Sequence, residues 1–251
     1  MTLVPELVAH RGEMTFYPEN TLPALSAAIE AGARFVEFDI QMSKDAVPMV
    51  VHDVDLQRVA GISAFVKDLD ADELEQINAD KSAPAFQSAC EASIPTLMTV
   101  VSFLNEHSRI TAFVEIKIAG TEHVGMERSV DRVLGDLESS RFPVSIVSFS
   151  RDIIHLVRKS TSCPTGWVLN TYDEDSKSQC VSLAPDFVFC NVKHLPPACE
   201  SLWPIEGKWV IYDIVNPAEA MQLFAGGADM IETGDIITML NSEPFNSPAY
   251  D

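Results

Sequence analysis

Basic residues are scarce in this chain of 251 residues, which has 17 Lys plus Arg against 37 Asp plus Glu. The formal net charge of −20 and the pI near 4.5 argue against a nucleic-acid binder and against a protein held on anionic lipid by a basic face. Net charge governs solubility and long-range steering, but it does not reveal what a local pocket binds.

Long apolar runs and paired cysteines are also missing. No run approaches the length of a membrane span, and residues 1–12 lack the basic and apolar regions of a signal peptide. The five cysteines are odd in number and form no C-x-x-C pair, which argues against a disulfide framework or a zinc site. We therefore expect reduced, mostly buried thiols and a cytoplasmic protein without stable membrane association.

Short apolar segments rich in β-forming residues alternate with helical patterns along the chain. Strands are predicted at 7–10, 35–40, 111–117, 144–149, 165–169, 186–190, 208–214 and 229–233. Helices are predicted near 21–31, 97–107, 121–139, 151–160, 173–183, 194–202 and 217–225. Thr21 and Asn216 each precede an early proline, as N-caps do, and the glycines at 226–227 follow the last helix. Eight strands separated by helices predict an α/β fold, a TIM-type (β/α)₈ barrel rather than an open sheet.

Two segments break this alternation. The β-rich run at 48–52 follows the run at 35–43 after only the short segment 44–47, which is too short for a crossover helix and predicts an antiparallel hairpin. The stretch at about 54–95 lacks strand–helix alternation and holds one modest helix near 70–78. We interpret it as an insertion on a single barrel domain that covers residues 1–251.

Two predicted strands carry acids among apolar residues. Alternation places Glu37 and Asp39 on one face of the strand predicted at 35–40. It places Glu115 and Lys117 on one face of the strand predicted at 111–117. Adjacent buried carboxylates need a cation, and at the carboxyl ends of barrel strands the three acids would suit one Mg²⁺ or Ca²⁺. The alternative is that they form ordinary ion pairs or solvated strand ends.

Two histidines end strand segments near these acids. His10 precedes Arg11 at the end of the first strand, and His52 ends the hairpin. One imidazole could accept a proton from a nucleophilic hydroxyl while the other donates a proton to a leaving oxygen. Arg11 and Lys117 could hold phosphate oxygens, or could simply pair with neighbouring acids. A lone histidine is more often structural, and the case here depends on the pair.

The ordered set of these motifs resembles the glycerophosphodiester phosphodiesterase family. The matching segments are Ala9-His10-Arg11-Gly12, Pro18-Glu19-Asn20-Thr21, Glu37-Phe38-Asp39, His52-Asp53, Glu115-Ile116-Lys117 and Ser148-Phe149. The resemblance runs from residue 8 to about 150, with a weaker echo at 208–235. Each motif is weak alone, but the ordered set is specific.

The resemblance implies a (β/α)₈ barrel with a small insertion that hydrolyses a glycerophosphodiester to glycerol 3-phosphate and an alcohol. It implies these roles: divalent metal on Glu37, Asp39 and Glu115; acid–base catalysis by His10 and His52; phosphate binding by Arg11 and Lys117. The neighbouring glycerol hydroxyl would attack first, giving a cyclic phosphate that water opens. With one ion loaded, these acids and cations would leave the pocket one net positive charge.

The sequence departs from the family pattern in two late motifs. Residues 212–215 read Tyr-Asp-Ile-Val where relatives have Trp-Thr-Val-Asn, and Tyr212 could keep an aromatic wall against glycerol. Residues 231–234 read Ile-Glu-Thr-Gly where relatives have Ile-Ile-Thr-Asp. Because of these changes, the sequence does not identify which head-group alcohol is released. Two alternatives also stay open: an enzyme for another, lysophospholipid-type diester, and a non-catalytic phosphodiester-binding barrel.

Overall fold

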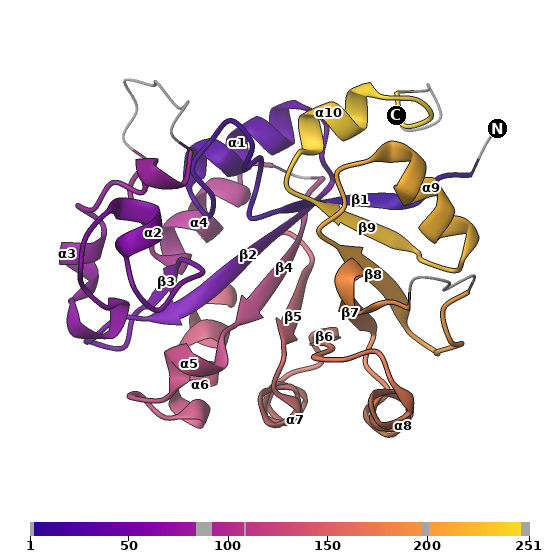
Figure 1. Ribbon diagram of the computed structural model, residues 1–251. Helices are drawn as coiled ribbons and strands as arrows, with labels where there is room; N and C mark the ends of the chain where they lie inside the picture. The colour runs from indigo at the N-terminus through magenta and orange to yellow at the C-terminus, as the bar shows by residue number, and fades with distance from the viewer. Residues whose placement is uncertain (1–2, 84–91, 108, 197–200, 247–251) are drawn as a thin grey trace.

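The computed structural model describes residues 3–83, 92–107, 109–196 and 201–246, and in them the predicted barrel is confirmed. Eight parallel strands form one sheet, which closes because β1 pairs with both β2 and β9 (Figure 1). These strands are β1 (Glu6–His10), β2 (Phe35–Met42), β4 (Thr111–Ile116), β5 (Val144–Ser148), β6 (Thr165–Val168), β7 (Phe187–Asn191), β8 (Lys208–Tyr212) and β9 (Met230–Thr233).

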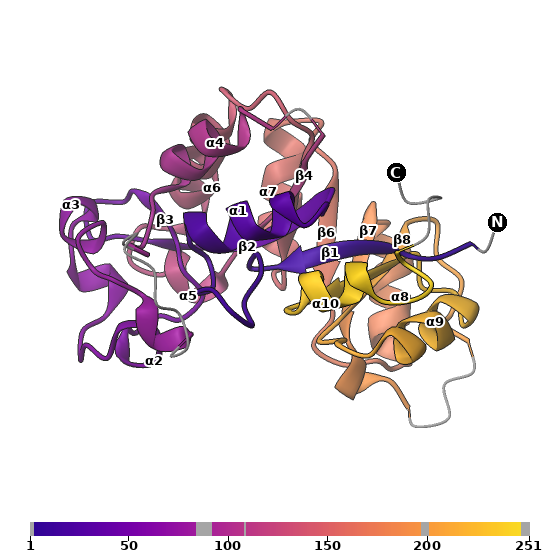
Figure 2. The same cartoon turned by 90° about the horizontal axis from the view of Figure 1, so that it is seen from above.

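Helices surround the barrel and cover the outward faces of its strands (Figure 2). They are α1 (Leu22–Glu30), α4 (Leu97–Leu104), α5 (Ile118–Thr121), α6 (Met126–Leu137), α7 (Arg151–Ser160), α8 (Glu174–Leu183), α9 (Pro217–Ala225) and α10 (Ile236–Asn241). The main core lies between the two layers, where Val36, Phe38 and Ile40 of β2 pack among buried helix residues such as Leu25 and Val101. None of the described helices has both the length and the apolar character needed to cross a bilayer.

The predicted helix boundaries hold where capping residues mark them. The Thr21 side chain accepts a hydrogen bond from the Ala24 amide, and Asn216 accepts from the first amides of α9. The helix predicted over 194–202 is wrong: η3 (Val192–His194) is a single 3₁₀ turn, and residues 195–196 and 201–202 are not helical. The two prolines at 196–197 explain this, because proline lacks an amide donor and disfavours helix in the residue before it. Residues 197–200 lie outside the described ranges.

The predicted hairpin is confirmed. β3 (Pro48–Val50) runs antiparallel to β2, with Ile40 opposite Val50 and Met42 opposite Pro48. The hairpin makes β3 a ninth strand on the sheet, and the chain leaves it towards His52 at the carboxyl end of the barrel strands. The hairpin therefore delivers a histidine to the barrel from outside the (β/α) alternation.

The chain between β3 and α4 forms short helical segments with a small core of their own. The segments are α2 (Gln57–Ala60), η1 (Val66–Asp68), α3 (Ala71–Leu74) and η2 (Asp80–Ser82). Their apolar cluster includes Leu56, Val59, Leu74 and Ile94, and it lies at the side of the barrel away from β7, β8 and α9 (Figures 1 and 2). The helix predicted near 70–78 is shorter than expected, and residues 84–91 lie outside the described ranges. The assignment of one domain with one insertion stays a prediction.

The inside of the barrel is filled in two levels. Seven apolar side chains, each at most 3 % exposed, close the interior: Val8, Phe113, Val147, Val168, Phe189, Val210 and Met230. Two residues further along four of these strands stand His10, Glu115, Tyr212 and Glu232, which alternation turns to the same inner face. A polar level therefore lies on an apolar floor at the carboxyl ends of the strands, where barrels of this type carry their sites.

Candidate active site

The turn after β1 passes very close to the backbone of α1. Arg11 and Gly12 both have left-handed backbone angles, with φ of 56° and 82°. A Cβ at Gly12 would lie 2.6 Å from the carbonyl carbon of Ala24 in α1, so only glycine fits this position. The turn brings the Arg11 backbone amide to 3.2 Å from Glu37 Oε2, to which it donates a hydrogen bond.

The three acids predicted as metal ligands are brought together. Glu37 and Asp39 project from β2, and Asp39 stands directly opposite Glu115 in the parallel ladder between β2 and β4. Their exposed fractions are 3 %, 1 % and 8 %, and one oxygen from each lies within 4.8 Å of the others. Three buried carboxylates at such separations repel one another unless cations lie among them.

Two cationic side chains contact this group. Lys117 Nζ lies 2.7 Å from Asp39 Oδ1 and 2.8 Å from Glu115 Oε1. Arg11 Nε lies 3.1 Å from Asp39 Oδ2, and the same oxygen accepts a hydrogen bond of 2.8 Å from Asn20 Nδ2. Asp39 and Glu115, which are predicted as metal ligands, therefore also form ion pairs with these cations. The two interpretations of the acids describe the same group of side chains.

The surroundings shift the pKa values of these three acids in different directions. Burial would raise the pKa of Asp39, but Lys117 and Arg11 outweigh it and hold that pKa below its ordinary value. The pKa of Glu37 rises well above its usual range because the carboxyl is buried and faces the charge of Asp39. Burial also raises the pKa of Glu115, against the opposing pull of Lys117. The site thus holds more carboxylate than its own cations neutralise.

The donor set fits a hard divalent cation. Within the described residues, Glu37 Oε1 is buried without a hydrogen-bond partner, which is costly for a carboxylate oxygen unless a cation is present. All three acids offer oxygen, the donor that Mg²⁺ and Ca²⁺ prefer. The residues present are therefore able to hold such an ion.

His52 is oriented by its neighbour. Its Nδ1 lies 2.6 Å from Asp53 Oδ1, and its backbone carbonyl accepts a 2.7 Å hydrogen bond from Gln41 Nε2. Gln41 follows Glu37 and Asp39 on the same face of β2. The strand that carries the acids thus also fixes the backbone of His52.

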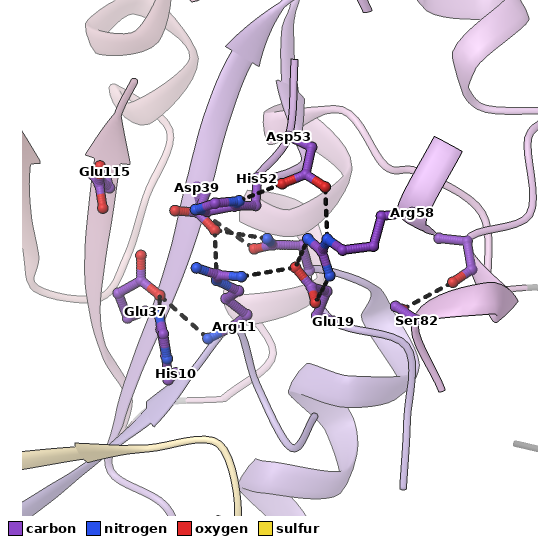
Figure 3. A network of polar contacts seen from close by, with 12 residues as sticks. His10, Arg11, Glu19, Glu37, Asp39, His52, Asp53, Arg58, Ser82 and Glu115 are labelled. Atoms are coloured by element: carbon purple, nitrogen blue, oxygen red, sulfur yellow. Dashed lines mark hydrogen bonds and ion pairs between the residues drawn. The ribbon is translucent and has the colours of Figure 1, made fainter. Parts of the chain in front are cut away.

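Asp53 leads into a chain of ion pairs (Figure 3). Arg58 of α2 donates from Nε to Asp53 Oδ2 at 2.7 Å and from its two terminal nitrogens to Glu19 at 2.6 and 2.9 Å. Glu19, which is buried, also accepts from Arg11 at 2.9 Å. Through Arg58 the segment between β3 and α4 is connected to both His52 and Arg11.

His10 meets a carboxylate to which the sequence analysis gives no role. Its Nε2 lies 3.3 Å from Glu232 Oε1 of β9 and 4.0 Å from Glu37 Oε2, and its Nδ1 lies 3.9 Å from Asp213 Oδ1. Burial, with the positive charge of Arg11, lowers the pKa of His10 to about 3, so the imidazole is neutral at neutral pH. Burial and the charges of Glu115 and Asp39 raise the pKa of Glu232 well above its ordinary value.

All of the predicted site residues except Asp39 line one cavity of about 80 Å³. Tyr212 is half-buried there, with its ring centroid 6.2 Å from that of His10, and Phe149 and Phe189 supply apolar wall. A larger hollow of about 370 Å³ lies beside α8, but its lining includes only one acid, Glu206, and no histidine. Size alone therefore does not locate the chemistry.

The Arg58 contacts predict a defect at a distance from the reacting groups. Arg58→Met should lower kcat about 10- to 100-fold, because Asp53 and Glu19 lose the cation that holds them while they orient His52 and Arg11. The measurement is release of glycerol 3-phosphate, the product that the family resemblance implies. Lys81→Met, which removes an exposed cation from the same segment, is the control and should keep full activity. Equal activity of the two variants would contradict the role of Arg58.

The architecture defines a class. The fold is similar to that of a phosphodiesterase of Oleispira antarctica solved in complex with sn-glycerol-3-phosphate (TM-score 0.80, 20 % identity, 94 % and 95 % of the two chains). It is also similar to the glycerophosphodiester phosphodiesterase of Thermotoga maritima (TM-score 0.73, 22 % identity, 96 % and 99 %). At these identities the likeness establishes the (β/α)₈ barrel.

Sequence comparison gives the family. Residues 10–198 match the model of the glycerophosphoryl diester phosphodiesterase family, so the chain belongs to this family. It is 36 % identical over 135 residues to YhdW of Bacillus subtilis, covering 53 % of each chain. It is 32 % identical over 125 residues to the glycerophosphodiester phosphodiesterase of Bacillus altitudinis, covering 50 % of each chain. The chain thus spans about half the length of these relatives.

Proposed function

We propose that the protein hydrolyses glycerophosphodiesters to glycerol 3-phosphate and an alcohol. The observation that carries this proposal is the convergence of two histidines, three carboxylates and two cationic side chains on one cavity. Family membership supports it, as does the similarity in fold to the Oleispira antarctica phosphodiesterase, which was solved in complex with the product sn-glycerol-3-phosphate. Binding a diester without cleaving it would not require both histidines.

One divalent cation, Mg²⁺ or Ca²⁺, is proposed on Glu37, Asp39 and Glu115. When bound, such an ion would act as a Lewis acid on a phosphate oxygen and offset negative charge there. Neutralising the acids would leave positive charge on Arg11 and Lys117 for the diester, by a planar fork from the first and a point charge from the second. Tyr212 would line the glycerol side of the cavity.

His10 and His52 are proposed as the acid–base pair. One imidazole takes the proton of a glycerol hydroxyl as that oxygen attacks phosphorus, and the other protonates the alcohol oxygen as its bond to phosphorus breaks. Water then opens the cyclic phosphate with the same two groups. His10 lines the same cavity as His52, and Asp53 holds the ring of His52 in place.

The test is turnover of defined diesters. Purified protein is incubated with glycerophosphocholine, glycerophosphoethanolamine or a lysophospholipid, each with Mg²⁺, Ca²⁺ or EDTA, and both the released head-group alcohol and the released glycerol 3-phosphate are measured. We expect glycerol 3-phosphate from the glycerophosphodiesters with a metal ion and none with EDTA. No turnover of any diester with either ion would favour a binding barrel and overturn the proposal.

A further inference from the structure

Glu232 is a fourth buried carboxylate at the site, and the three-acid group does not account for it. It is 3 % exposed, and among the described residues its Oε2 has no hydrogen-bond partner. Alternation along β9 points it into the barrel above Met230, where it lines the same cavity as His10 and Glu37. An unpartnered carboxylate oxygen at this depth is costly unless a cation meets it.

The groups around Glu232 have the spacing of a coordination shell. His10 Nε2 lies 3.3 Å from Glu232 Oε1 and 4.0 Å from Glu37 Oε2, and the three residues offer donor atoms that all lie within 4.8 Å of one another. Donor atoms around an ion with bonds of about 2.1 Å lie about 3 to 4 Å apart. Glu37 also belongs to the group formed with Asp39 and Glu115, and its Oε1 has no partner within the described residues.

We propose that His10, Glu37 and Glu232 form a second divalent-cation site, which shares Glu37 with the first. An imidazole with two carboxylates suits Mn²⁺ or Zn²⁺, whereas the all-oxygen group suits Mg²⁺ or Ca²⁺. The two sites therefore differ in the ions they accept, because Mn²⁺ fits both donor sets whereas Mg²⁺ prefers the all-oxygen group. With four carboxylates facing Arg11 and Lys117, one divalent ion brings the pocket only to neutrality, and a second ion offsets the charge of an incoming anion.

The second site has a consequence that rests on the proposed function. An ion on Nε2 of His10 takes the lone pair with which that nitrogen would accept a proton. Filling the second site therefore inhibits hydrolysis, so saturating Mn²⁺, which fills both sites, gives less turnover than saturating Mg²⁺. Mg²⁺, which prefers oxygen donors, gives activation alone.

The direct test counts ions on the intact chain. Equilibrium dialysis with Mn²⁺ should give two bound ions per wild-type chain and one for Glu232→Gln, with circular dichroism to establish folding. Asp213→Asn, which removes a charge 3.9 Å from the other ring nitrogen of His10, is the matched control and should keep two. Glu232→Ile, which restores the residue of the family motif, is a second variant and should bind one.

Two outcomes overturn the site: one bound Mn²⁺ per wild-type chain, or two on either folded Glu232 variant. Pulsed electron paramagnetic resonance adds a readout on wild-type protein alone, because Mn²⁺ at the second site should show nitrogen coupling from an imidazole. Absence of that coupling at saturating Mn²⁺ would likewise overturn the proposal. Binding is measured without substrate, so two bound ions with no diester turnover would refute the proposed function and leave the site standing.

Discussion

His52→Ala and His10→Ala should each lower kcat for glycerophosphodiester hydrolysis about 10²- to 10⁴-fold, the usual loss on removing a positioned acid or base. His52 is held on both sides, by Asp53 at Nδ1 and by Gln41 at its carbonyl, so its ring is fixed for proton transfer. His10 stands in the same cavity with a neutral imidazole. Because Arg11 and Lys117 remain, KM should change much less than kcat.

The measurement is steady-state release of glycerol 3-phosphate at saturating Mg²⁺. His155→Ala provides the control, since His155 is exposed on the outer helix α7 and should be dispensable. Full activity of a folded His52→Ala or His10→Ala protein would show that the acid–base assignment is wrong.

The double variant Glu37→Gln/Asp39→Asn should lower Mg²⁺ affinity more than about 100-fold and abolish measurable turnover. Two of the three acids proposed as oxygen ligands lose their charge, while Arg11 and Lys117 remain beside them and repel a cation. Isothermal titration calorimetry measures the affinity, and EDTA treatment of the wild-type protein should reproduce the loss of activity.

The matched control removes the same charge elsewhere. Glu174→Gln/Asp175→Asn changes two exposed acids in the first turn of α8 and should leave both affinity and turnover unchanged. Metal affinity retained by the Glu37→Gln/Asp39→Asn protein would remove these residues from the ligand set.

Local rules predicted the parts of the site that lie on strands. Alternation put Glu37 and Asp39 on one face, and the parallel ladder then set Asp39 opposite Glu115. The five residues between β2 and β3 are too few for a crossover helix and required a hairpin, and the hairpin brought His52 to the barrel. In each case the backbone geometry of a strand determines where the side chain goes, so the sequence pattern was sufficient.

The sequence analysis does not identify Arg58 or Glu232. The role of Arg58 depends on tertiary contacts, whereas that of Glu232 follows from strand alternation. Arg58 reaches Glu19 across 39 positions of sequence, from a four-residue helix without periodicity. Glu232 could have been found, because a glutamate within an apolar strand and two residues from Met230 shares its inward face. The resemblance to the family shows position 232 only as a departure from isoleucine. The expected net charge of the pocket was therefore one unit too positive with a single ion bound.

The apolar floor of the barrel limits how molecules enter and leave the site. Seven side chains at most 3 % exposed seal the interior beneath His10 and Glu115, so within the described chain the polar level opens only towards the carboxyl ends of the strands. In the proposed reaction the metal ion, the diester, water and both products would all use that one opening. If the proposed reaction holds, a glycerol 3-phosphate that has not departed would block the next diester, and the order in which the two products leave would determine how strongly they inhibit the reaction.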